Sequence, residues 1–108
     1  MLKAEFRSNL NKFIALQKDK KRIVLEEIMK EGLAEIGNVT PVKSGYLKSQ
    51  NKASISNEDT ITFYNNAEYA EFVEFGTYRM RAQYFMRRGI SALKNKVPQI
   101  LKERLGVW

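Results

Sequence analysis

The sequence predicts an α+β fold in one domain that spans residues 1–108. Three observations lead to this prediction. Apolar residues recur every three to four positions in the first third of the chain and again from Phe85 onward, which is the period of a buried helix face. Between these two segments, β-branched and aromatic residues replace the helical period. A chain of 108 residues can bury one hydrophobic core but not two.

The N-terminal region is expected to be helical as far as about Ile36. Its apolar residues follow the helical period in two groups on either side of the polar run 17–22: Phe6, Leu10, Phe13 and Ile14, then Val24, Leu25, Ile28, Met29, Leu33 and Ile36. Either one long helix exposes this run, or two helices meet there with Asp19 as an N-cap. Gly37 and Asn38 tolerate the conformation that ends helices, and Pro41 follows soon after.

A β-hairpin is expected next, after a turn-rich linker at residues 40–47. Residues 52–56 and 60–64 have the composition of two strands, and the polar run 57–59 lies between them as a turn. A lone hairpin is only marginally stable in water, so these strands should pack on the helices. The outer strand would then leave unpaired backbone groups at the sheet edge, where another chain can dock.

Two further helices complete the predicted fold. Residues 68–75 return to the helical period and favour a short helix, although an extended segment is a close alternative. The last helix should begin near Phe85 and bury one apolar face: Met86, Ile90, Leu93, Val97, Ile100, Leu101 and Leu105. Pro98 lies inside it and removes a backbone hydrogen bond, so a kink or a restart is expected there.

Several classes of enzyme lack their usual side chains in this sequence. It has no cysteine and no histidine, which excludes disulfides, thiolate metal sites and the commonest general base. Glu68, Glu71 and Glu74 would form a loose acidic ridge on a helix, but the outer two are almost two turns apart and make a poor metal site. Ser44 has no base partner that would activate it. We therefore expect no enzymatic activity, no metal and no cofactor.

The net charge of +7 is concentrated toward the C-terminal end, where residues 82–108 carry six basic groups and one acidic group. Such a surface attracts nucleic acid or an acidic protein, although a solvated helix face has the same composition. No apolar run approaches the roughly 18 residues that span a bilayer, and the first residues lack the apolar core of a signal peptide. A soluble protein made in a cytoplasm, without membrane contact, is expected.

Five aromatic side chains surround one glycine, Gly76, in residues 66–87: Tyr69, Phe72, Phe75, Tyr84 and Phe85. We expect Gly76 to take a positive φ and end a helix, so that Phe72 and Phe75 turn inward and residues 77–81 leave as a loop. The aromatics either form core or, with the nearby methionines and arginines, a subunit interface. The candidate interface residues are Phe75, Gly76, Arg79, Arg81, Gln83 and Phe85. The three glutamates could pair with arginines of a neighbouring copy.

Three blocks resemble, in order and spacing, the signatures of a tailed-phage family typified by gene product ten of phage Hong Kong ninety-seven. They are Pro-Val-Lys-Ser-Gly-Tyr-Leu at residues 41–47, Tyr-Ala-Glu-Phe-Val-Glu-Phe-Gly-Thr at 69–77 and Ala-Gln-Tyr-Phe-Met-Arg at 82–87. Four residues depart from the usual pattern: Lys43 replaces Asp, Tyr84 and Arg88 replace prolines, and Gly89 replaces Ala.

The resemblance implies a structural ring subunit of the virion neck, without catalytic activity, that completes the tail and joins it to the head. Its implied partners are further copies of itself, the connector or head-closure proteins and the tail tube protein. DNA would pass through the ring without sequence-specific binding. Made in the cytoplasm of the bacterial host, it would end in the virion. Two alternatives remain: a small basic nucleic-acid-binding module, supported by charge alone, and a metal-dependent nuclease, which would need a convergent acidic cluster.

Overall fold

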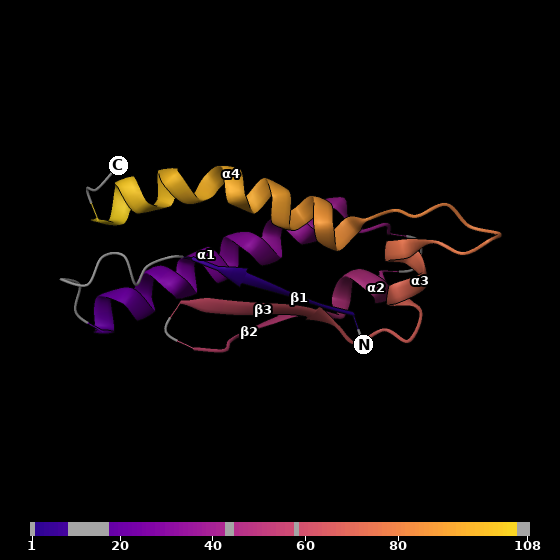
Figure 1. Ribbon diagram of the computed structural model, residues 1–108, viewed down its shortest axis with the longest axis horizontal. Coiled ribbons are helices and arrows are strands. Elements are labelled where there is room, and N and C mark those ends of the chain that lie inside the picture. Colours follow the sequence, from indigo (N-terminus) through magenta and orange to yellow (C-terminus); the bar gives the residue numbers. More distant parts are fainter. Residues whose placement is uncertain (1, 9–17, 43–44, 58, 106–108) are drawn as a thin grey trace.

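The computed structural model describes residues 2–8, 18–42, 45–57 and 59–105. Its helices and strands follow the chain in the order β1 (Leu2–Arg7), α1 (Lys18–Val39), α2 (Tyr46–Ser49), β2 (Asn51–Ile55), β3 (Thr60–Asn65), α3 (Ala70–Phe75) and α4 (Phe85–Leu105). Figure 1 shows α1 lying between α4 and the sheet, with α2 and α3 together at one end. The molecule is elongated, with extents of 51 × 22 × 21 Å. The mixed α+β class predicted from the sequence is confirmed.

Strand β1 corrects the sequence prediction, which places Phe6 in a helix. Residues 2–7 are extended, and Phe6 belongs to the strand. The physical reason is the alternation of Leu2, Ala4 and Phe6 with charged residues, which puts all three apolar side chains on one face of a strand. The expected helical positions Leu10, Phe13 and Ile14 lie outside the described residues.

The described strands form an antiparallel sheet in the order β1-β3-β2. The predicted hairpin of β2 and β3 is confirmed, and its turn is closed by the Ser56 N–H, which donates to the Thr60 carbonyl at 2.8 Å. Strand β1 covers the other side of β3, pairing Phe6 with Ile61 and Ala4 with Phe63. Ile61 and Phe63 are fully buried, so the central strand anchors the core. The outer edges within the described sheet belong to β1 and β2.

Helix α1 ends one turn later than predicted. Gly37 and Asn38 are helical, and α1 continues to Val39. The stop comes from Thr40, whose hydroxyl donates to the Ile36 carbonyl at 2.6 Å and so satisfies an acceptor left over at the helix end. Asp19 is not the N-cap of a helix, because the described helix already includes the residue before it, Lys18. Where the helix begins beyond that point lies outside the described residues.

Helices α1 and α4 pack closely because a glycine lies in the contact. A Cβ on Gly89 would lie 2.5 Å from the Ile36 Cα, and real Cβ atoms essentially never approach that closely. The seam is flanked by ion pairs, with Lys96 Nζ at 2.9 Å from Glu31 and 2.5 Å from Glu35. Helix α4 runs without interruption through Pro98, so the expected restart is absent.

Candidate functional site

Among the described residues, seven of the eight large hydrophobic side chains that are exposed lie at one end of the molecule. We call this surface the aromatic end and define it by seven exposed residues: Val42, Tyr46, Tyr69, Phe72, Phe75, Tyr78 and Met80. They belong to α2, α3 and the loops beside them, which Figure 1 shows gathered at the end of the molecule away from the C-terminus. The rings of Tyr46 and Tyr69 are 6.3 Å apart, which links α2 to α3. A monomer rarely exposes such a group of apolar side chains unless it is a contact surface.

Helix α3 turns its aromatics outward and its carboxylate inward, opposite to the prediction. Phe72 and Phe75 are 57% and 64% exposed, whereas Glu74 is only 3% exposed. The backbone N–H groups of Met86 and Arg87 donate to the two carboxylate oxygens of Glu74 at 2.7 and 3.0 Å. N–H groups in the first turn of a helix have no partner within it, and the helix dipole favours an anion there. Glu74 therefore caps α4, and the aromatics are left at the surface.

The acidic ridge expected on α3 does not form, because its three glutamates separate. Glu68 lies before the helix, which starts at Ala70, and Glu68 and Glu71 are exposed while Glu74 is buried. Among the described residues, no group of three or more acidic side chains could hold a metal ion.

Residues 76–84 form an arm between α3 and α4, and its base is fixed by backbone bonds. Gly76 has a φ of 78°, which confirms the predicted positive φ at the end of the helix. A Cβ there would lie 2.7 Å from the Ala82 backbone nitrogen, so a larger residue has no room. The N–H of Gln83 donates to the Val73 carbonyl at 2.8 Å and closes the base of the arm.

The tip of the arm is a tight turn that presents one aromatic side chain. The N–H of Thr77 donates to the Met80 carbonyl at 2.8 Å, and the Thr77 hydroxyl accepts from the N–H groups of Arg79 and Met80. Tyr78 lies within this turn and is 91% exposed. Figure 1 shows the arm extending beyond the body of the molecule. Tyr78 is therefore held in a defined place with almost no contact to its own chain.

A buried polar network fixes α2 against the sheet. Asn65 is fully buried, and its amide nitrogen donates to the Leu47 carbonyl at 2.9 Å and to Asn51 Oδ1 at 2.8 Å. Its amide oxygen accepts from the Ala67 N–H at 2.8 Å. Asn51 donates onward to the Thr40 hydroxyl at 3.0 Å. Because unpaired polar groups are costly in a core, this network holds the segments before and after α2 in one arrangement.

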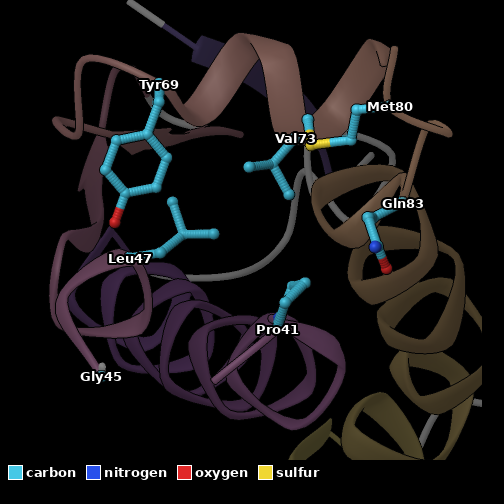
Figure 2. A pocket seen from close by; sticks show the side chains of 7 residues that line it. All are labelled: Pro41, Gly45, Leu47, Tyr69, Val73, Met80 and Gln83. Carbon is cyan, nitrogen blue, oxygen red and sulfur yellow. The ribbon is translucent and has the colours of Figure 1, made fainter. Parts of the chain in front are cut away.

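A pocket of about 580 Å³ opens between α2, α3 and the arm. Figure 2 shows its lining around a single space: Pro41, Gly45, Leu47, Tyr69, Val73, Met80 and Gln83. These residues come from the two resembling blocks at 41–47 and 69–77, from Gln83 in the third, and from the arm. Segments far apart in the sequence thus build one largely apolar concavity beside the aromatic end.

The six predicted interface residues divide into a surface group and a buried residue. Phe75, Arg79, Arg81 and Gln83 are exposed, and Gly76 is half-buried at the helix end. Phe85 is fully buried in the core, where a partner cannot reach it in the folded chain. Phe85 therefore belongs to the core, whereas Phe75 lies at the surface, where its role in an interface stays a prediction.

The basic excess near the C-terminus is partly neutralised within the molecule. Lys96 binds Glu31 and Glu35, and these hydrogen bonds raise the pKa of Lys96 above its ordinary value. Arg104 Nε lies 2.6 Å from Glu27 Oε2, and this hydrogen bond likewise raises the pKa of Arg104. These two cations therefore join α1 to α4 in addition to contributing to a basic surface.

Sequence reasoning missed the part of the aromatic end that comes from residues 42–46. Val42 and Tyr46 were not assigned to the interface, and Phe72 was expected to face inward. The buried residues of α3 are Ala70 and Glu74, four apart, so its inner face is formed by a small residue and a carboxylate. The Glu74 carboxylate, which orients α3 so that its aromatics face outward, accepts a hydrogen bond from the Met86 N–H, twelve residues later in the chain. No local sequence pattern signals that contact.

A comparison with protein-family models relates this fold and site to known proteins. The model described as "Bacteriophage HK97-gp10, putative tail-component" matches residues 4–76, more than half of the 108-residue chain. The match includes the first resembling block and nearly all of the second, and the third lies beyond it. Searches among curated proteins and among solved structures found no match. Within the described residues no helix is long and apolar enough to cross a membrane. The chain belongs to the HK97-gp10-like family of bacteriophage tail components.

Proposed function

We propose that this protein is a ring subunit of the phage neck that joins the capsid connector to the tail. The aromatic end is the observation that carries the proposal. An assembly subunit has to fold on its own in water and still expose an apolar surface whose burial against a partner lowers the free energy. Phe72 and Phe75 are held outward by the inward bonds of Glu74, so their exposure is built into the fold. Family membership supports a structural role in the phage tail or neck.

The proposed partners are other copies of the chain, the connector or head-closure proteins and the tail tube protein. Aromatic, methionine and arginine side chains are enriched at protein interfaces, and the arm combines all three. DNA passes through the ring without base readout, and the protein acts as a scaffold without enzymatic turnover. Its place of action is the virion neck, after synthesis in the bacterial host.

A phage that lacks the gene tests this function. We expect filled heads and complete tails to accumulate unjoined, and the gene supplied from a plasmid to restore joined particles. The double variant Phe72→Ser, Phe75→Ser should fail to restore them. Ile23→Ser is the matched control, since Ile23 is as exposed as Phe72 but lies on α1 outside the aromatic end. Normal joining without the gene would refute the proposed function.

A further inference from the structure

The aromatic end carries a projecting side chain, Tyr78, beside a pocket whose lining includes Met80 and Gln83 of the same arm. Tyr78 projects from the tip of the arm and is not among the described residues that line the pocket. The pocket measures about 580 Å³, within the range of about 300–1,000 Å³ typical of sites that enclose a ligand. Its walls are mainly apolar, with Leu47, Val73 and Pro41 around the space in Figure 2. Such walls suit an aromatic ring.

Tyr78 has the properties of an interface anchor. The hydrogen bonds of Thr77 hold the turn before any partner arrives, so little backbone freedom is lost on binding. The Arg79 guanidinium lies 5.2 Å from the centre of the Tyr78 ring, which adds a cation to the exposed tip. Tyrosine and arginine are among the residue types enriched in the side chains that dominate binding energy.

The arm and the pocket rim carry charges of both signs. The arm carries Arg79 and Arg81, which are both exposed. On the pocket side, Tyr69 lines the cavity and is followed on α3 by Glu71 and preceded by Glu68, both acidic and exposed. Arg79 and Arg81 also flank Met80, which lines the same pocket, so the acidic side of the rim is the one at α3. An arm from a second copy would bring its arginines toward that side.

We propose that, within the ring of the proposed function, Tyr78 of one copy occupies the pocket of the next copy. The contact joins two different patches, the arm tip and the pocket, and repetition of such a head-to-tail contact gives a ring when the rotation between neighbouring copies closes. Each subunit then offers one arm and receives one. The inference depends on the ring proposed above and identifies its contact.

Photocrosslinking in phage particles tests the contact. Tyr78 is replaced by p-benzoylphenylalanine, an aromatic residue that keeps the shape of an anchor, and joined particles are irradiated. We expect crosslinked dimers of this chain, with the link mapped to residues 41–47 or 69–73 of the second copy. The same photoreactive residue at Ile23, an exposed apolar position on α1, is the control and should give no link to those segments.

The outcomes separate this inference from the proposed function. A link from position 78 to a connector or tail protein, or no dimer in particles that contain the chain, overturns the arm-in-pocket contact and leaves the neck role intact. Particles that join normally without the chain overturn both. A second measurement uses Tyr78→Ala and Tyr78→Phe, and we expect the yield of joined particles to fall at least tenfold with alanine and to stay within twofold with phenylalanine. Equal yields from both variants would also overturn the contact.

Discussion

Glu74 determines how the end of the molecule is built, because its carboxylate binds two N–H groups of α4 from the preceding helix. Removing it leaves those donors without their partner, at a site that is buried at Met86 and partly buried at Arg87. Glu74→Ala should lower the free energy of unfolding by about 1–3 kcal/mol, the usual effect of leaving buried hydrogen-bonding groups unsatisfied. Urea denaturation followed by circular dichroism measures this change.

Glu68→Ala is the matched control for that variant, since Glu68 is an exposed glutamate near the same helix. Its substitution should change the free energy of unfolding by no more than about 0.5 kcal/mol, as is usual for surface positions. Equal effects of the two alanine variants would show that the capping bonds of Glu74 contribute nothing to stability.

Two glycines provide opposite tests of helix packing. Gly89→Ala would place a Cβ about 2.5 Å from the Ile36 Cα, so α4 has to move away from α1, and the free energy of unfolding should fall by about 1–3 kcal/mol. Gly37→Ala lies within α1 and meets only the flexible end of Lys48, at 3.4 Å. It should leave stability unchanged or raise it by up to about 1 kcal/mol, the helix preference of alanine over glycine. Thermal unfolding of both variants checks the pair, and a stable Gly89→Ala protein would contradict the close packing.

At the scale of elements, the sequence predicted those that follow a single regular pattern. Helices α1 and α4 and the hairpin were found because their apolar positions repeat at the helix or strand period. Strand β1 was missed although Leu2, Ala4 and Phe6 alternate, because Phe6 also fits the spacing of the apolar residues that follow it. Phe6 fits both the strand period of the residues before it and the helix period of the residues after it, so the sequence pattern alone does not decide its structure. In the fold, the pairing of β1 with β3 makes it part of a strand.

The candidate site could be predicted only in part, for a different physical reason. Residue composition pointed to the end of α3 and the arm, where Phe75 is exposed on the helix and Arg79, Arg81 and Gln83 are exposed on the arm. The pocket could not be foreseen, because it depends on the Asn65 network that brings α2 beside α3. The direction of α3 depends on a carboxylate that binds a helix start distant in sequence. Contacts of this kind produce no periodic pattern in the sequence.

The ion pairs between α1 and α4 predict a pH dependence of stability. The folded pKa of Lys96 is raised above 10.5 by Glu35 and Glu31, so its contribution is complete below about pH 10.5 and is lost as the pH rises through the raised value. Between pH 8 and about pH 12 the wild-type protein should therefore lose more stability than Lys96→Gln. The effect should be modest, because the pair is exposed to solvent.

Chemical denaturation across this pH range measures the difference. Lys94→Gln is the control, since Lys94 is an exposed lysine on the same helix. This variant should follow the wild-type curve. Parallel curves for the wild-type protein and Lys96→Gln would mean that the bridges to α1 do not stabilise the fold.

At the scale of the whole molecule, the arm can be altered without disturbing the core. Arg79 and Arg81 are exposed, so Arg79→Glu with Arg81→Glu should leave the folded chain intact, with its unfolding temperature nearly unchanged. In the virion the reversed charges would face Glu68 and Glu71 of the next copy, and head-tail joining should be blocked. Plaque counts and electron microscopy of lysates check this, with Lys94→Glu as a charge-reversal control on α4. Normal joining by the double variant would remove the arm from the interface.

Phe85 illustrates why such tests must spare the core. It is fully buried, and Phe85→Ala should lower the free energy of unfolding by about 3–5 kcal/mol, as for other large-to-small changes in a core. A joining defect in that variant would reflect loss of the fold as readily as loss of a contact. The arginines and Tyr78 therefore give cleaner evidence on assembly.

Electron cryo-microscopy of the neck in intact phage particles tests the proposed ring most directly. We expect a closed ring of this chain between the connector and the tail, with the aromatic end buried in contacts between subunits or with neighbouring proteins. A neck that is complete without this chain would contradict the proposed function. A ring in which Phe72, Phe75 and Tyr78 all face solvent would contradict the role assigned to the aromatic end.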